Sequence, residues 1–217
     1  MKIALQFAMP SEFHAMPGAK DMEPFETVSG VPFYRVEPDI IACAGGVSKV
    51  NAAMATQLLI SLYQPDLVLN AGVAGCFENM PIGSIVLAEG FLQHDVDTST
   101  LGDRVGLVST VNRVQFPTSD PDRARAAMDR VGVPYRTGWV ATGDWFATDT
   151  PRAHWIADTF HPLLCDMEGC ADAQVCLRNN VPFMSIKSVS DCLFEHHDFV
   201  FNLSLIHISE PTRLQLI

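Results

Sequence analysis

Continuous apolar runs alternate with amphipathic stretches along the chain. The runs at residues 2–8, 32–43, 66–75, 83–91, 135–144, 163–165 and 182–191 predict strands. Segments 45–64, 119–132 and 169–180 have the spacing and the end residues of helices. Strands that are apolar throughout are typical of sheets covered on both faces. The pattern therefore predicts one α/β domain of three layers.

The helix expected over residues 45–64 begins with two glycines and ends before Pro65. Its larger apolar residues recur at helical spacing, which predicts one apolar face directed at the core. That face comprises Val50, Ala53, Met54, Leu58, Leu59 and Leu62.

Four acidic residues stand at or just after expected strand ends: Glu12, Asp166, Glu168 and Asp191. Ligands of such folds collect beyond the carboxyl ends of the strands. Gly72 and Gly75 are expected in a turn after the strand that ends at Asn70, where backbone can approach a ligand closely.

Each acid has an ordinary structural reading. Glu12 suits the first turn of a helix after Pro10, Asp166 and Glu168 suit helix capping, and Asp191 suits an N-cap or a surface turn. Together, four carboxylates with few cations nearby suit a reaction with a cationic transition state. Glycosyl transfer and hydrolysis are the obvious cases, since one acid protonates the leaving group and another activates water.

Composition narrows the classes of partner. The chain has 217 residues, 48% of them hydrophobic, and a net charge of −11, which argues against nucleic acid as a partner. Its six cysteines show no CxxC spacing, so they are expected to be buried thiols of a reducing compartment rather than metal ligands. The N-terminus does not resemble a signal peptide, and no run approaches the length of a membrane helix. We expect a cytoplasmic protein without metal, cofactor or membrane partner.

Seven stretches, in order, resemble the nucleoside phosphorylase superfamily, and within it the methylthioadenosine/S-adenosylhomocysteine nucleosidases. They are MKIALQFAMPSE, GGVSKVNAAMAT, LVLNAGVAG, HDVD (His94–Asp97), TGDWF (Thr142–Phe146), DMEG and SVSD. The resemblance covers residues 1–202. It implies a three-layer fold with a central mixed sheet, a homodimer, no cofactor, and hydrolysis of the N-ribosidic bond of methylthioadenosine or S-adenosylhomocysteine with release of adenine, as in methionine salvage.

The resemblance also implies catalytic roles. Asp191 would give a proton to purine N7, and Glu12 would orient and deprotonate the attacking water. Glu168 would accept hydrogen bonds from the ribose hydroxyls beside Met167, because a carboxylate is an acceptor for two donors. Asp166 would support this junction at the edge of the substrate site.

Further substrate contacts follow from the same resemblance. Phe146 would stack on the purine, backbone groups near Ala147 would meet the base edge, and Met9 would pack beneath the sugar. Ser190 belongs to the SVSD motif. Lys187 stands where the family usually has an arginine, and it lacks the planar fork of that side chain.

Several residues depart from the family pattern, Lys187 among them, and one departure lies near the expected ribose position. Val73 stands where the nucleosidases usually have serine, so a hydroxyl near the ribose is missing. Two alternatives therefore stay open. Phosphorolysis is disfavoured because Asn70 occupies a position where phosphorylases have an arginine for phosphate. A homologue that binds nucleosides without turnover would fit both Val73 and Lys187.

The C-terminal sequence sets an expected boundary. Residues Leu203–Arg213 resemble the translation of a sequencing adapter, so we expect a native domain over 1–202 and a non-native tail over 203–217. The resemblance implies a helix after the Asp191 loop that this chain lacks. Without it an apolar sheet face would be exposed, and the chain is expected to aggregate or to unfold in part.

Overall fold

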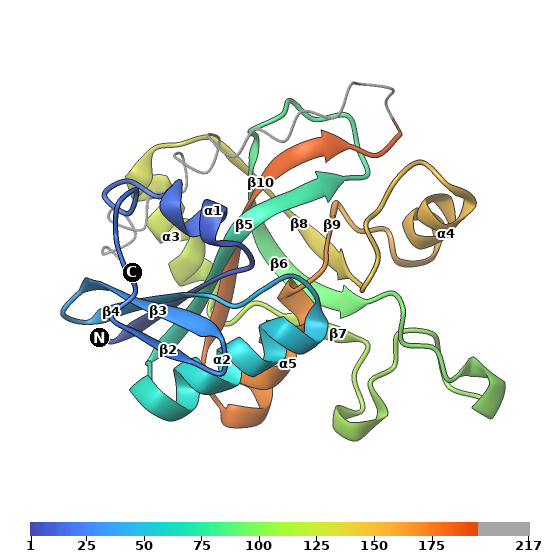
Figure 1. Ribbon diagram of the computed structural model, residues 1–217. Coiled ribbons are helices and arrows are strands. Elements are labelled where there is room, and N and C mark those ends of the chain that lie inside the picture. Colours follow the sequence, from blue (N-terminus) through green and yellow to red (C-terminus); the bar gives the residue numbers. More distant parts are fainter. Residues whose placement is uncertain (195–217) are drawn as a thin grey trace.

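The structure is a computed structural model that describes residues 1–194, in which ten strands form one mixed sheet (Figure 1). The expected boundary near residue 202 and the tail over 203–217 lie outside the described residues. The strands are β1 (Ile3–Phe7), β2 (Glu26–Val28), β3 (Val31–Glu37), β4 (Ile40–Ala44), β5 (Leu67–Cys76), β6 (Ile85–Gln93), β7 (Gln115–Pro117), β8 (Tyr135–Thr142), β9 (Leu164–Asp166) and β10 (Phe183–Cys192).

Strand β5 is the hub of the sheet. It runs parallel to β1 and β10 and pairs antiparallel with β9 at its C-terminal end. Strand β10 also pairs with β6, β6 with β8, and β8 with β9. These pairings close a ring of five strands, from which β1, β4, β3 and β2 extend in that order. The expected mixed sheet is confirmed.

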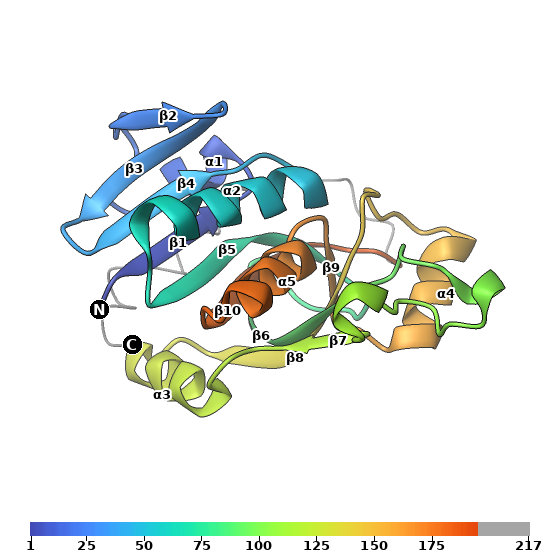
Figure 2. The same ribbon diagram turned by 90° about the horizontal axis from the view of Figure 1, so that it is seen from below.

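Helices cover both faces of the sheet, which confirms the three layers. The helices are α1 (Pro10–His14), α2 (Lys49–Tyr63), α3 (Pro121–Val131), α4 (Pro151–Phe160) and α5 (Gly169–Asn179). Short 3₁₀ turns span Ser99–Leu101 and Ser109–Val111. Helices α2 and α5 lie side by side against one face (Figure 2), and α1 and α3 lie against the other. Helix α4 packs at the ends of β6, β8 and β9.

Alternation along β1 shows how one strand serves two cores. Ile3, Leu5 and Phe7 belong to the core under α1 and α3, whereas Ala4 belongs to the core under α2 and α5. All five residues of β1 are buried, and so are all five of β4. Continuous apolar runs therefore mark strands that are covered twice, as the sequence predicted.

The apolar face expected for α2 is wrong in part, since of its six residues only Leu59 is buried and Leu58 packs partly buried against the core. The buried residues of the helix are Ala52, Ala55, Thr56 and Leu59, while Val50, Met54 and Leu62 are exposed. Small side chains let α2 approach the sheet and α5 closely. Thr56 is tolerated inside because its hydroxyl donates to the Asp172 carboxylate at 2.7 Å. Helix α2 carries apolar residues around most of its circumference, so periodicity does not identify the buried side.

The glycine-rich turn expected after Asn70 is also wrong. Strand β5 continues to Cys76, because β10 pairs with it as far as that residue and β9 pairs with its last two residues. Neither Gly72 nor Gly75 has a positive φ. The missing side chain of Gly72 makes room for the Glu12 carboxylate instead.

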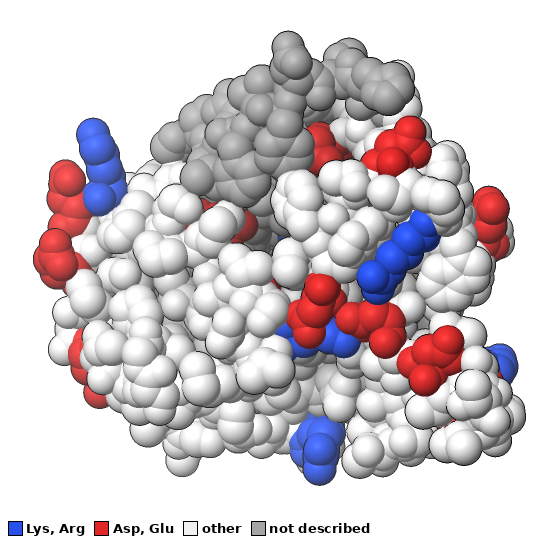
Figure 3. Space-filling view, turned by 45° about the vertical axis from the view of Figure 1, so that its right-hand side comes forward, with Lys and Arg blue, Asp and Glu red and all other residues white. Residues whose placement is uncertain are grey.

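The surface contains no continuous basic patch on the face shown in Figure 3, where Lys and Arg side chains lie scattered among acidic ones. Within residues 1–194, no helix combines the length and apolar character needed to cross a bilayer. All six cysteines are free, and only Cys192 is not buried.

Candidate active site

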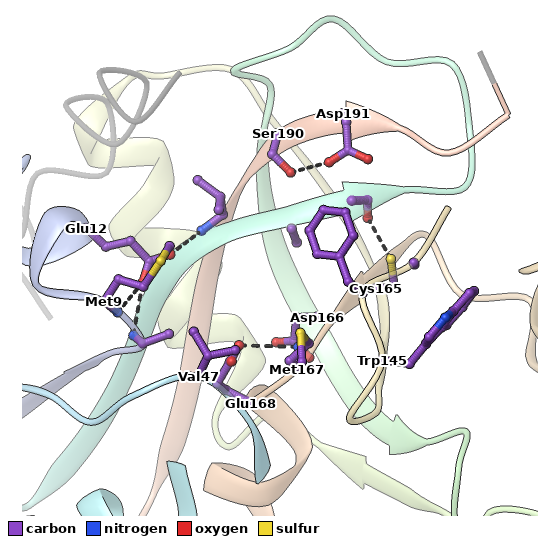
Figure 4. Close-up of a pocket in the computed structure, with 16 residues that line it drawn as sticks. Met9, Glu12, Val47, Trp145, Cys165, Asp166, Met167, Glu168, Ser190 and Asp191 are labelled. Carbon is purple, nitrogen blue, oxygen red and sulfur yellow. Dashed lines mark hydrogen bonds between the residues drawn. The ribbon is translucent and has the colours of Figure 1, made fainter. Parts of the chain in front are cut away.

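A cavity of about 330 Å³ opens at the carboxyl ends of β1, β5, β9 and β10 (Figure 4). Every residue predicted for the site lines it except Lys187. Those residues are Met9, Glu12, Val73, Phe146, Ala147, Asp166, Met167, Glu168, Ser190 and Asp191. The strand ends therefore bring together residues from distant parts of the chain, as expected for this class of fold.

Glu12 lies at the first turn of α1 and is 2% exposed. Its Oε2 accepts the N–H groups of Ala8 at 3.0 Å and Met9 at 2.9 Å, and its Oε1 accepts that of Val73 at 3.1 Å. Burial raises the pKa of Glu12, although Lys187 and these N–H groups oppose the rise. The carboxylate therefore bonds the N–H groups at the start of α1, as the structural interpretation predicted, and it also lines the cavity.

Gly72 makes the position of Glu12 possible. A Cβ at Gly72 would lie 2.7 Å from Glu12 Oε1, which is closer than real Cβ contacts allow. The carboxylate thus packs directly on the backbone of β5, within reach of the Val73 N–H.

Asp191 lies near the end of β10, across the cavity from Glu12 in Figure 4. The Ser190 hydroxyl donates to Asp191 Oδ1 at 2.5 Å. A Cβ at Gly75 would lie 3.1 Å from Cys165 Sγ, which is a tight contact, and 3.5 Å from Asp191 Oδ2, which is an ordinary one, so this glycine makes room chiefly for Cys165. Register between β10 and β5 shifts between Val189 and Asp191, which re-aims the strand end at the cavity.

Glu168 precedes α5 and is 7% exposed. Its Oε1 accepts the Ser48 N–H at 3.0 Å, from a residue 120 positions away, and Oε2 accepts the Met167 N–H at 3.2 Å. Burial and then repulsion from Asp166 raise the pKa of Glu168 to about 7. Its side chain does not cap α5, so the capping interpretation fails for this acid.

Asp166 caps α5 and supports the junction, as expected. Its Oδ2 accepts the Gly169 N–H at 3.0 Å and its Oδ1 accepts the Thr142 hydroxyl at 2.6 Å. The Lys187 ammonium lies 3.0 Å from Oδ2, and both side chains of this ion pair are buried. Lys187 therefore lies beneath the cavity rather than in its lining.

Behind these groups, Asp172 on α5 is fully buried. It accepts hydrogen bonds from Thr56 at 2.7 Å and Asn70 at 3.2 Å, and burial raises its pKa well above the ordinary value. Four carboxyl groups are therefore buried together with a single ammonium group, that of Lys187. They belong to Glu12, Asp166, Glu168 and Asp172.

Two aromatic side chains also line the cavity. Phe146 and Trp145 follow β8, and Phe146 is half exposed. The Arg152 guanidinium lies 4.8 Å above the Trp145 ring. An apolar wall beside acidic groups suits a flat heterocycle attached to a sugar.

Sequence reasoning missed part of the lining: Ala8, Val47, Ala74 and Cys165. Gly75 was expected near a ligand, although in a turn rather than in a strand. Val47 had one signal, its place in the glycine-led segment before α2. Cys165 had none, since a buried strand cysteine is usually structural, and burial raises the pKa of its thiol well above the ordinary value.

The lining limits the chemistry. Among the described residues that form it there is no lysine or arginine, and residues 1–194 contain no cluster of side chains that could hold a metal ion. Carboxyl groups are the acid–base groups that the cavity offers.

The sequence is similar to that of known proteins. The sequence profile of the Phosphorylase superfamily matches residues 2–206. A 5′-methylthioadenosine/S-adenosylhomocysteine nucleosidase of Shewanella sp. (strain W3-18-1) is 34% identical over 198 residues, covering 88% of this chain and 86% of the relative.

Two solved structures resemble this one. The nucleosidase of the same name from Colwellia psychrerythraea 34H, in complex with adenine, superposes with a TM-score of 0.83 at 28% identity, covering 100% of this chain and 93% of that one. Futalosine hydrolase of Helicobacter pylori strain 26695 has a TM-score of 0.86 at 23% identity, covering 100% and 96%, which shows a shared fold.

Proposed function

The chain belongs to the Phosphorylase superfamily and, within it, to the purine nucleosidases; from that premise we propose that it hydrolyses methylthioadenosine or S-adenosylhomocysteine. The products are adenine and the corresponding 5′-substituted ribose. The observation that carries the proposal is a cavity with four carboxyl groups and no lysine or arginine in its described lining.

Absence of a lining cation favours water over phosphate as the nucleophile. A phosphate dianion is normally held by arginine, lysine or backbone N–H groups. Here Lys187 lies beneath the lining and is paired with Asp166 at 3.0 Å, and the three N–H groups around Glu12 are occupied by its carboxylate. Phosphate would meet Glu12 without a countercharge.

In the proposed reaction, water attacks C1′ of the ribose while the bond from C1′ to purine N9 breaks. Glu12 takes a proton from the water, and the bonding electron pair leaves with the base. Asp191 gives its proton to N7, so that the purine leaves neutral. A general base works best when its pKa lies near the working pH, and burial moves the pKa of Glu12 in that direction.

Glu168 would accept the ribose hydroxyls and stabilise the positive charge that develops on the sugar. The Ser48 N–H at 3.0 Å holds one of its oxygens in place before substrate arrives. Val73 holds Glu12 through its backbone N–H. The absence of a serine hydroxyl at this position therefore leaves the general base, Glu12, in place.

We also propose a homodimer built on α2. Val50 is 74% exposed, Met54 38% and Leu62 49%, and they follow Val47, which lines the cavity rim. An exposed apolar stripe of this kind marks an interface. Val50→Glu should shift the mass measured by light scattering from dimer to monomer, and a monomeric wild-type protein would contradict the proposal.

The function is tested by measuring base release by chromatography. Methylthioadenosine, S-adenosylhomocysteine, adenosine, inosine and futalosine are each incubated with enzyme, with and without phosphate. Adenine release from the first two without phosphate is expected, and Glu12→Gln and Asp191→Asn should abolish it while the circular dichroism spectrum stays unchanged. Base release that requires phosphate would contradict hydrolysis and indicate phosphorolysis. A preference for futalosine would contradict the proposed substrates.

A further inference from the structure

The segment His94–Asp97 after β6 takes no part in the proposed chemistry, yet it touches the loop that carries Trp145 and Phe146. Asp95 Oδ1 accepts the Lys49 ammonium at 2.6 Å, and its Oδ2 accepts the Asp144 N–H at 2.9 Å. One carboxylate thus joins the start of α2 to the loop after β8.

The start of α2 binds two parts of the site, the loop after β8 and the Glu168 carboxyl group. The Lys49 N–H donates to Asp144 Oδ1 at 2.8 Å, and the preceding N–H, of Ser48, donates to Glu168 at 3.0 Å. The Ser48 side chain does not cap the helix, and its φ of 92° is rare for a residue other than glycine. Neighbouring N–H groups therefore hold the base-side loop and the ribose-side acid.

His94 forms the floor beneath this loop. It is 3% exposed, and a Cβ at Gly143 would lie 2.3 Å from its ring. The Trp145 ring meets it edge-on with centroids 6.2 Å apart. Burial lowers the pKa of His94 to about 4, so a neutral ring packs there at neutral pH. Its Nδ1 finds no hydrogen-bond partner among the described residues.

We propose that Asp95 is a positioning residue, whose bridge from Lys49 to the Asp144 N–H sets where the purine lies relative to Glu168. The inference rests on the proposed function, in that the loop receives the base. Burial raises the pKa of Asp95, but the hydrogen bonds and the charge of Lys49 outweigh it and hold the pKa below its ordinary value. The bridge is therefore charged at neutral pH.

Asp95→Asn tests this proposal with little change of shape. The amide replaces one carboxylate oxygen by an NH₂ group, so in this geometry it can accept from either the Lys49 ammonium or the Asp144 N–H but not from both. We expect kcat/KM to fall by at least about tenfold, mainly through KM, since small misplacement of bound groups is costly. The dissociation constant for free adenine, measured by calorimetry, should rise by a similar factor. Lys49→Met should give a comparable loss, and the two losses should not add in the double variant.

Asp97→Asn is the matched control. Asp97 lies two positions along the same segment and is exposed. Its hydrogen bonds run to Ser99 within its own turn, where it accepts the N–H at 2.8 Å and the hydroxyl. Its kcat/KM and adenine affinity should stay within twofold of wild type. Equal losses in both variants would show a general structural effect and would overturn the proposal.

Hydrogen exchange supplies a readout that needs no turnover. In Asp95→Asn, exchange should quicken in segments 47–51 and 143–149 and stay unchanged in β1 and β5. If the wild type releases no adenine, the proposed function fails. The exchange pattern would still show whether Asp95 holds the start of α2 and the loop after β8 together. Unchanged exchange in both segments, or unchanged adenine affinity in a protein that binds adenine, would overturn it.

Discussion

Glu168 gives the sharpest prediction on stability. The carboxyl is 7% exposed and its pKa rises from 4.5 to about 7 on folding. A group whose folded-state pKa is raised binds its proton more tightly in the folded state. Its stabilising contribution is therefore complete below pH 4.5 and is lost as pH rises through 7. Glu168→Gln removes this loss.

The magnitude follows from the two pKa values. A rise of the pKa from 4.5 to about 7 corresponds to about 3 kcal/mol at full ionisation. Between pH 5 and pH 8, about 2–3 kcal/mol of that difference develops, because the unfolded-state group is already largely ionised at pH 5. The pH-independent cost of the amide, chiefly its poorer contact with the Met167 N–H, cancels in the comparison.

The assay is urea unfolding of wild type and Glu168→Gln at both pH values. The variant should gain about 2–3 kcal/mol relative to wild type on going from pH 5 to pH 8. Ser48→Ala is the control, because it keeps the backbone N–H that binds Glu168, and it should follow the wild-type dependence on pH. A parallel dependence of wild type and Glu168→Gln would refute the reasoning.

Three further predictions concern the site. Lys187→Met should lower the free energy of unfolding by about 3–5 kcal/mol, measured in denaturant, because it leaves the Asp166 charge buried without its partner; Lys187→Arg, which keeps the charge, should lose less. Gly72→Ala should lower kcat by at least about tenfold, with a smaller effect on KM, because its Cβ would lie 2.7 Å from Glu12 Oε1 and would displace the base; an unchanged kcat would count against Glu12 as the base. Phe146→Ala should raise KM by about tenfold through lost stacking, at a nearly constant melting temperature, since the ring is half exposed.

Strand ends were the most predictable part of the molecule. Apolar runs placed the strands, and acids at their ends placed the site, because parallel strands bring their carboxyl ends to one edge. Glu12, Asp191 and Glu168 line one cavity as a result. The resemblance to a family added the roles of these residues, which spacing alone left open.

Packing choices were less predictable. Helix α2 buries Ala52, Ala55 and Thr56 and exposes Val50 and Met54, the reverse of what residue size suggests. Close approach of α2 to α5, together with the hydrogen bond from Thr56 to Asp172, decides the orientation, and neither can be read from periodicity.

Two other features also depend on tertiary structure, and one helix was missed despite a local signal. Lys187 lies among carboxyl groups that come from separate elements, so its burial depends on the assembled site. Gly72 keeps extended geometry because β10 continues beside β5. Helix α4 was not predicted, although Thr150 and Pro151 are typical residues for a helix start. In the structure the Thr150 hydroxyl accepts the Ala153 N–H at 3.3 Å.

The central claim is that water, activated at Glu12, attacks the sugar. Turnover of methylthioadenosine in H₂¹⁸O with phosphate present, followed by mass spectrometry of the sugar product, tests it most directly. The account predicts one ¹⁸O at C1 of 5-methylthioribose, no sugar 1-phosphate, and loss of this product in Glu12→Gln. A sugar 1-phosphate without ¹⁸O at C1 would contradict it.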